Sequence, residues 1–163
     1  MTQRPLTAVA LGILSLLTLA ACAGGPSMEQ SPSSTPVSRG QAEQRSAGVQ
    51  HRIVEAFPDG SVTRADDRKW VLLSCSNSEV QAAGGVAVTL AAPVDVEQTY
   101  DSITRAVEHD GYKGTIDTTP KGAKRLTITG QDNDQYLVTI YVEDKDVRIS
   151  SFSQCFPGSL SDS

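Results

Sequence analysis

The 163-residue sequence contains few of the residues that most often form catalytic and metal sites: three cysteines and two histidines. His51, His109 and the cysteines at 22, 75 and 155 lack the close spacing typical of zinc ligands. No Gly-x-Ser-x-Gly or Ser-x-x-Lys motif occurs, so nothing favours a serine hydrolase. We therefore predict no cofactor, no metal site and no enzyme activity.

Positive charge is also scarce, with 14 basic and 19 acidic residues and a net charge of −5. The densest basic group, Lys121, Lys124 and Arg125, adjoins a predicted turn at Pro120 and Gly122. Proteins that bind nucleic acids concentrate basic residues because neutralising phosphates dominates their affinity. We therefore expect no nucleic-acid partner.

Acidic residues gather in two predicted turns, around Asp132-Asn133-Asp134 and around Glu143 and Asp144. The first turn lacks the glycine and the distant glutamate of an EF-hand, so it is interpreted as a solvated hairpin tip. Because carboxylates also serve in cell-wall hydrolases and transferases, Asp132 and Glu143 remain candidates for such an enzyme as an alternative function.

The sequence has no apolar run of the roughly 20 residues that a membrane-spanning helix needs, because the run from Leu6 to Ala20 is only about 15 residues long. Arg4 precedes this run, as in an export signal. The run closes with the bacterial lipobox pattern Leu19-Ala20-Ala21-Cys22. We predict a lipoprotein signal peptide at 1–21 and a lipid anchor on the Cys22 thiol. The alternative is an ordinary secretory signal beside which Cys22 falls by chance.

A diacylglyceryl group on Cys22 would supply the two chains that stable membrane anchoring requires. Removing residues 1–21 takes away one basic residue, Arg4, and no acidic residue, so the net charge would fall from −5 to −6. An acidic chain without a basic cluster after Cys22 gains little from anionic lipids. The predicted partner is thus a membrane reached through the lipid anchor, with the domain on the extracytoplasmic face of the cell membrane.

Assigning Cys22 to lipid leaves Cys75 and Cys155 as an even pair, which we predict to form a disulfide in an oxidising compartment. Residues 22–38 are rich in serine and proline and are predicted to be a tether. A globular domain should follow at 39–157, and residues 158–163 are expected to be a disordered tail.

Hydrophobic spacing predicts two helices, one over 40–56 and one that begins after a cap at Asp95 and ends near Gly111. Apolar runs predict strands at 69–75 and 86–90, with a loop at 82–85 between them. Alternating residues predict further strands near 115–118, 126–129, 136–143 and 147–156. The expected fold is α+β: a two-layer sandwich of two helices on a mainly antiparallel sheet of five to six strands, with one disulfide.

Few side chains suggest a ligand site in this predicted domain. Trp70 is interpreted as a core residue, and Tyr141 is the better candidate for an exposed aromatic contact. The order of lipobox, tether, helix, the strand from Trp70 to Cys75 and Cys155-Phe156-Pro157 resembles small cell-envelope lipoproteins of mycobacteria and related actinobacteria, the LppA-like type. The resemblance implies a cell-surface lipoprotein and no particular activity.

The sequence therefore predicts a lipid-anchored, non-enzymatic domain that binds a protein partner or an envelope ligand. A carrier of lipids or glycolipids is a further alternative, which would need an apolar cavity between helices and sheet. The oligomeric state is left open.

Overall fold

A computed structural model describes residues 36–162 of the chain. The predicted signal peptide, the lipobox and Cys22 lie outside the described residues. Two α-helices and a seven-stranded sheet form the domain. In chain order, the elements are α1 (Arg39–Glu55), β1 (Val62–Ser74), β2 (Glu79–Leu90), α2 (Val96–Glu108), β3 (Lys113–Thr118), β4 (Lys124–Thr129), β5 (Gln135–Tyr141), β6 (Asp146–Phe152), β7 (Phe156–Pro157) and the 3₁₀ turn η1 (Leu160–Asp162).

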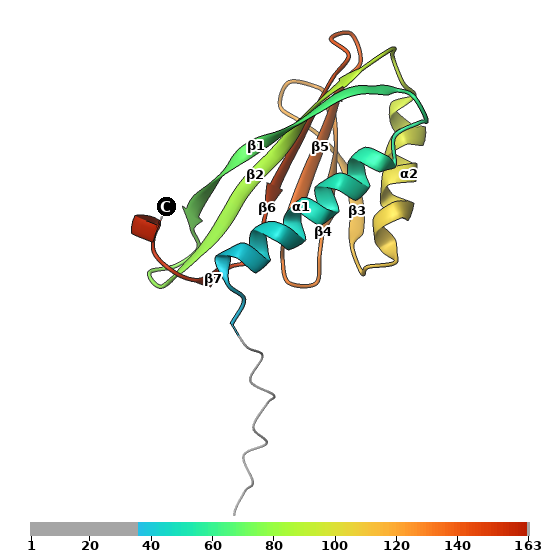
Figure 1. Cartoon of the computed structure of the whole chain (residues 1–163). Coiled ribbons are helices and arrows are strands. Elements are labelled where there is room, and N and C mark those ends of the chain that lie inside the picture. Colours follow the sequence, from blue (N-terminus) through green and yellow to red (C-terminus); the bar gives the residue numbers. More distant parts are fainter. Residues whose placement is uncertain (1–35, 163) are drawn as a thin grey trace, which may run out of the picture. The chain divides into compact units, whose positions relative to one another are not determined.

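The sheet has the strand order β1-β2-β6-β5-β4-β3, and β7 pairs with the beginning of β2. All neighbouring strands are antiparallel. Both helices lie on the same face of this sheet (Figure 1). The predicted α+β sandwich of two helices on an antiparallel sheet is confirmed.

Local sequence signals explain where the helices begin and end. Ser38 and Gln41 form a capping box at the start of α1, and Asp95 caps α2 by accepting a hydrogen bond of 2.9 Å from the backbone of Gln98. Gly111 follows α2 with a φ of +83°, a backbone conformation that favours glycine. The predicted cap at Asp95 and the predicted helix end near Gly111 are confirmed.

Apolar side chains from both layers fill the space between the helices and the sheet. Five helix residues of this core are fully buried: Val49 and Ile53 of α1, and Tyr100, Ile103 and Val107 of α2. They pack against alternate residues of the four strands β2, β4, β5 and β6. Burial of this apolar surface is the main stabilising contribution to the fold.

Strands β1 and β2 are longer than the sequence predicts. Asp66 and Asp67, which precede the predicted strand at 69–75, lie within β1. Residues 82–85, expected in a loop, lie within β2. Two glycines allow β2 to continue: a Cβ on Gly84 would lie 2.5 Å from the Trp70 ring, and one on Gly85 would lie 2.2 Å from the Ile149 carbonyl oxygen. Glycine within a strand marks such close approaches rather than a break.

The predicted disulfide between Cys75 and Cys155 is present, with the two Cα atoms 6.3 Å apart. It joins the end of β1 to the segment between β6 and β7.

The expectation of a disordered tail at 158–163 is wrong for the described part, because Leu160–Asp162 form a 3₁₀ turn. The Asp162 carbonyl oxygen accepts a hydrogen bond of 2.8 Å from Arg39, which ties this turn to the start of α1.

Candidate functional site

One face of the sheet carries the two helices, and the opposite face is covered by neither (Figure 1). Because successive residues of a strand point to opposite faces, the residues that alternate with the core residues along each strand define this uncovered face. We call it the open face. Its residues include Arg64, Asp66, Arg68, Val71, Leu73, Ala83, Ala87, Thr89, Lys113, Thr115, Asp117, Arg125, Thr127, Thr129, Gln135, Leu137, Thr139, Tyr141, Asp146, Arg148, Ser150 and Phe152.

Two arginines on the open face flank Thr139, which is paired in register with Arg125 on one side and Arg148 on the other. We call Arg125 and Arg148 the arginine pair. Since neighbouring strands lie about 4.8 Å apart, the two backbone positions are separated by roughly 10 Å. The arginine pair thus presents two guanidinium groups on a flat surface.

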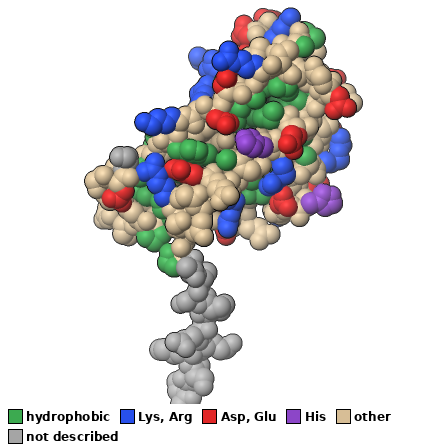
Figure 2. Space-filling model, in the orientation of Figure 1, with side chains coloured by type: hydrophobic (Ala, Val, Ile, Leu, Met, Phe, Trp, Pro, Cys, Tyr) green, Lys and Arg blue, Asp and Glu red, His purple; other side chains and the backbone are tan. Residues whose placement is uncertain are grey.

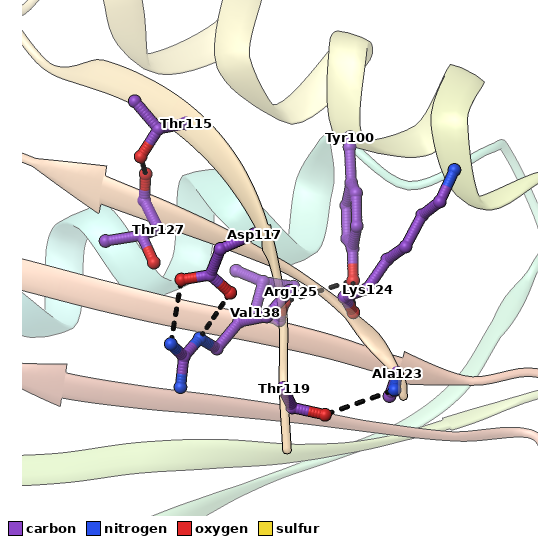
Figure 3. Close-up of polar contacts among 9 residues, drawn as sticks. All are labelled: Tyr100, Thr115, Asp117, Thr119, Ala123, Lys124, Arg125, Thr127 and Val138. Carbon is purple, nitrogen blue, oxygen red and sulfur yellow. Dashed lines mark hydrogen bonds and ion pairs between the residues drawn. The ribbon is translucent and has the colours of Figure 1, made fainter. Parts of the chain in front are cut away.

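Each arginine of the pair is held in place by its neighbours. Arg125 donates two hydrogen bonds to the Asp117 carboxylate, of 2.8 and 3.1 Å (Figure 3). The Arg148 guanidinium lies 5.2 Å from the centre of the Tyr141 ring and donates a 3.3 Å hydrogen bond to Asp146. These contacts reduce the conformational entropy that either arginine would lose on binding a ligand.

Tyr141, the predicted exposed aromatic residue, is half-buried on the open face, where Arg148 lies over its ring. Trp70, predicted to be a core residue, is also half-buried and packs at the edge of a small second cluster. The open face also exposes the apolar side chains of Val71, by 52%, and Leu73, by 39%. It therefore combines charged and apolar groups.

A buried polar cluster lies beneath the β4–β5 turn, and the sequence did not predict it. Asp134, expected at a solvated hairpin tip, is only 4% exposed. Its carboxylate accepts hydrogen bonds of 2.9 Å from Tyr112 and 3.0 Å from Tyr136. The two tyrosine rings meet edge to face, with centroids 5.8 Å apart. We call these three residues the tyrosine–aspartate cluster.

Burial and the nearby Asp134 charge raise the pKa of Tyr112 to about 12 and also raise the pKa of Tyr136. Both phenols are therefore protonated donors near neutral pH. Because the carboxylate is buried and its Oδ2 accepts from both tyrosine hydroxyls, this cluster stabilises the turn rather than presenting a reactive group.

The residues considered for catalysis are not brought together. Asp132 forms a 2.8 Å ion pair with Arg45 before β5 begins, whereas Glu143 follows the end of β5. A strand of seven residues separates these carboxylates by roughly 23 Å, far more than the 5 to 10 Å that glycosidase acid pairs use. The two acids do not form one site.

The two histidines are also separated. His51 of α1 lies 3.9 Å from the Asp67 carboxylate of β1, whereas His109 is the C-cap of α2. Within residues 36–162, no three histidine, cysteine or acidic side chains are grouped closely enough to hold a metal ion.

None of the helices in this range is long and apolar enough to cross a membrane.

One of the hollows on the helix side of the domain lies between α1 and the β1–β2 pair and is lined by apolar and charged residues. Its lining residues are His51, Val54, Glu55, Ala65, Asp67 and Val86. Figure 2 shows this side of the molecule, over which acidic and basic side chains are intermixed. The open face extends over six strands and is covered by neither α1 nor α2, so it is the better candidate for binding a macromolecule.

Comparison with known proteins found no matching family model, no matching curated protein and no matching solved structure. The resemblance to actinobacterial lipoproteins therefore stays a prediction from the sequence. The open face and its arginine pair must be interpreted from their own geometry.

Proposed function

We propose that this protein is a lipid-anchored lipoprotein on the extracytoplasmic side of a bacterial cell membrane, and that it binds a protein partner through the open face. The observation that carries the binding proposal is a sheet face that neither α1 nor α2 covers, on which arginines, an aromatic ring and exposed apolar side chains lie together. Arginine and tyrosine are enriched at protein interfaces because each combines a large contact area with directional hydrogen bonds.

The lipid anchor is proposed from the sequence around Cys22. Replacing Cys22→Ala should abolish fatty-acid labelling and partitioning into detergent, because the thiol that carries the lipid is removed. The variant Ala23→Ser is the control, since it keeps the thiol and should be labelled normally. Continued labelling of Cys22→Ala would contradict the anchor.

Binding through the open face is tested by photo-crosslinking in intact cells. A photoreactive amino acid replaces Thr127 on the open face in one variant and Asp101, which is exposed on α2, in the other. We expect a discrete crosslinked product with a second protein from position 127 and none of that size from position 101. Equal products from both positions, or none from 127, would contradict a role for the open face.

The alternative functions have less support. Asp132 and Glu143 lie at opposite ends of β5, so the proposal does not assign them a shared catalytic role. The space between helices and sheet is occupied by buried apolar side chains, which does not favour a carrier of lipids. A binding domain needs neither a paired carboxylate nor an internal cavity.

A further inference from the structure

Charge is distributed unevenly between the open face and the rest of the domain. The open face carries five basic residues and four acidic ones, a local net charge of +1, although the chain as a whole has −5. The undescribed residues include one basic and one acidic residue, so the described part also has −5 and its remaining surface has −6. The basic residues of the open face are Arg64, Arg68, Lys113, Arg125 and Arg148, and the acidic ones are Asp66, Glu79, Asp117 and Asp146.

The arginine pair retains hydrogen-bond donors that its own contacts do not use. Asp117 engages Nε and Nη2 of Arg125, and Asp146 engages only Nε of Arg148. A guanidinium has five N–H donors, so each arginine can still donate to a carboxylate from outside. Asp117 and Asp146 position the two arginines while leaving this capacity free.

A second copy of the chain fits this surface poorly. If two open faces met about a twofold axis through Thr139, Arg148 would lie opposite either Arg148 or Arg125 of the other copy, depending on the axis direction. Like charges in direct opposition disfavour such a dimer. The occupant that suits the face is therefore a different molecule with negative charge.

The arginine pair also lies away from the end of the sheet at which the described chain begins. Arg125 and Arg148 are near the starts of β4 and β6, whereas α1 begins beside Asp162, near the end of β6 (Figure 1). A membrane anchor before residue 36 would connect to the opposite end of the domain. This placement favours a protein ligand over the lipid headgroups of the anchoring membrane.

We infer that the arginine pair binds a carboxylate-rich segment of a partner protein, whose acidic side chains reach Arg125 and Arg148 across Thr139. This inference rests on the proposed binding function of the open face and specifies the chemistry of its partner. Charge complementarity of this kind sets which partner binds and speeds its association, especially at low salt.

The test uses the full-length lipidated protein in neutral detergent and a fluorescent hexaglutamate peptide as the probe. Arg148→Glu on the open face is compared with Arg105→Glu on α2, which changes the charge by the same amount at another exposed site. We expect the wild type and Arg105→Glu to bind hexaglutamate equally, and Arg148→Glu to bind it about tenfold more weakly or worse. Higher salt should weaken the wild-type complex.

Several results would overturn the inference. Failure of hexaglutamate to bind the wild type, or equal binding to Arg148→Glu and Arg105→Glu, would show that the arginine pair does not recognise carboxylates. Arg148-dependent binding to phosphatidylglycerol vesicles without peptide binding would assign the face to a lipid surface. A dimer that forms in the wild type but not in Arg148→Glu would assign the open face to a second copy of the chain.

The crosslinking experiment separates this inference from the proposed function. A partner captured from position 127 with undiminished yield in Arg148→Glu would contradict the acidic-partner inference and leave the binding function standing. Failure of capture from position 127 in the wild type would contradict the function itself.

Discussion

Tyr100 shows how one side chain joins the two layers of the domain. Its ring is fully buried between α2 and the sheet. Its hydroxyl donates toward the carbonyl oxygens of Lys124 and Val138, at 2.9 and 3.1 Å (Figure 3). It also accepts a hydrogen bond of 3.3 Å from the backbone N–H of Ile140. The hydroxyl thus satisfies backbone groups where the β4–β5 ladder ends.

Removing this hydroxyl tests its contribution. Tyr100→Phe should lower the free energy of unfolding by about 1 to 3 kcal/mol, because the buried backbone groups lose their partner. Tyr141→Phe is the matched control on the open face and should change stability by less than about 0.5 kcal/mol. Urea unfolding of both variants measures the difference, and equal stability would contradict the structural role of Tyr100.

The tyrosine–aspartate cluster predicts a loss of stability at alkaline pH. The pKa of Tyr112 is about 12 in the folded protein because burial and the Asp134 charge disfavour the phenolate, whereas an unfolded tyrosine has a pKa near 10. Below pH 10 the Tyr112 phenol is protonated in both the folded and the unfolded protein, so its contribution to stability is fully present there. Above pH 10 the unfolded state loses its proton first, and stability should fall as the pH rises toward 12.

Urea unfolding between pH 9 and pH 11 measures this decline. The variant Tyr112→Phe should be less stable than the wild type at pH 9, because Asp134 loses a donor. Its stability should also decline less steeply with pH, since one of the three buried phenols with a raised pKa is gone. An identical pH slope in both proteins would show that Tyr112 ionises normally.

The strands show how far the sequence could predict the structure. The α2 stripe, the caps and the alternating late strands are local patterns, and the structure confirms them. The β1–β2 hairpin was underestimated because charged residues in β1 and Gly84-Gly85 in β2 have loop-like composition, while their pairing depends on distant partners. Asp134 was misjudged for the same reason, since its burial depends on Tyr112, 22 residues away.

The glycine positions give a prediction for β2. Gly85→Ala should lower the free energy of unfolding by about 1 to 3 kcal/mol, because the new Cβ would lie 2.2 Å from the Ile149 carbonyl oxygen. Gly40→Ala in α1, where no atom lies within 4 Å of the new Cβ, should be neutral or stabilising by up to about 1 kcal/mol. Thermal unfolding checks both, and tolerance of Gly85→Ala would contradict the packing of β2 against β6.

The disulfide connects the first long strand, β1, to the segment between the last two strands, β6 and β7. Replacing both Cys75→Ser and Cys155→Ser should lower stability by about 4.5 kcal/mol in the chain-entropy model, because the bond closes a loop with a sequence separation of 80 residues. Denaturant unfolding of this double variant and of the reduced wild type should give similar values. A loss below about 1 kcal/mol would contradict a structural role for the bond.

The proposed function concerns the whole molecule: a lipid anchor before the domain, and a binding face whose basic residues lie away from the entry of the chain. The anchor is a prediction from the sequence alone, where the lipobox is a contiguous motif. The sequence could not predict the open face, because Arg125 and Arg148 come together only through the order β4-β5-β6. Their separate positions in the sequence give no sign of a shared surface.

Native mass spectrometry of the full-length protein, extracted from its own membrane in mild detergent, tests the central proposal most directly. We predict a chain that begins at Cys22, carries a diacylglyceryl group and the disulfide, and is bound to a second, different protein. The Arg148→Glu variant should keep the lipid and the disulfide but lose that protein. A chain without lipid that carries no partner would contradict the proposal.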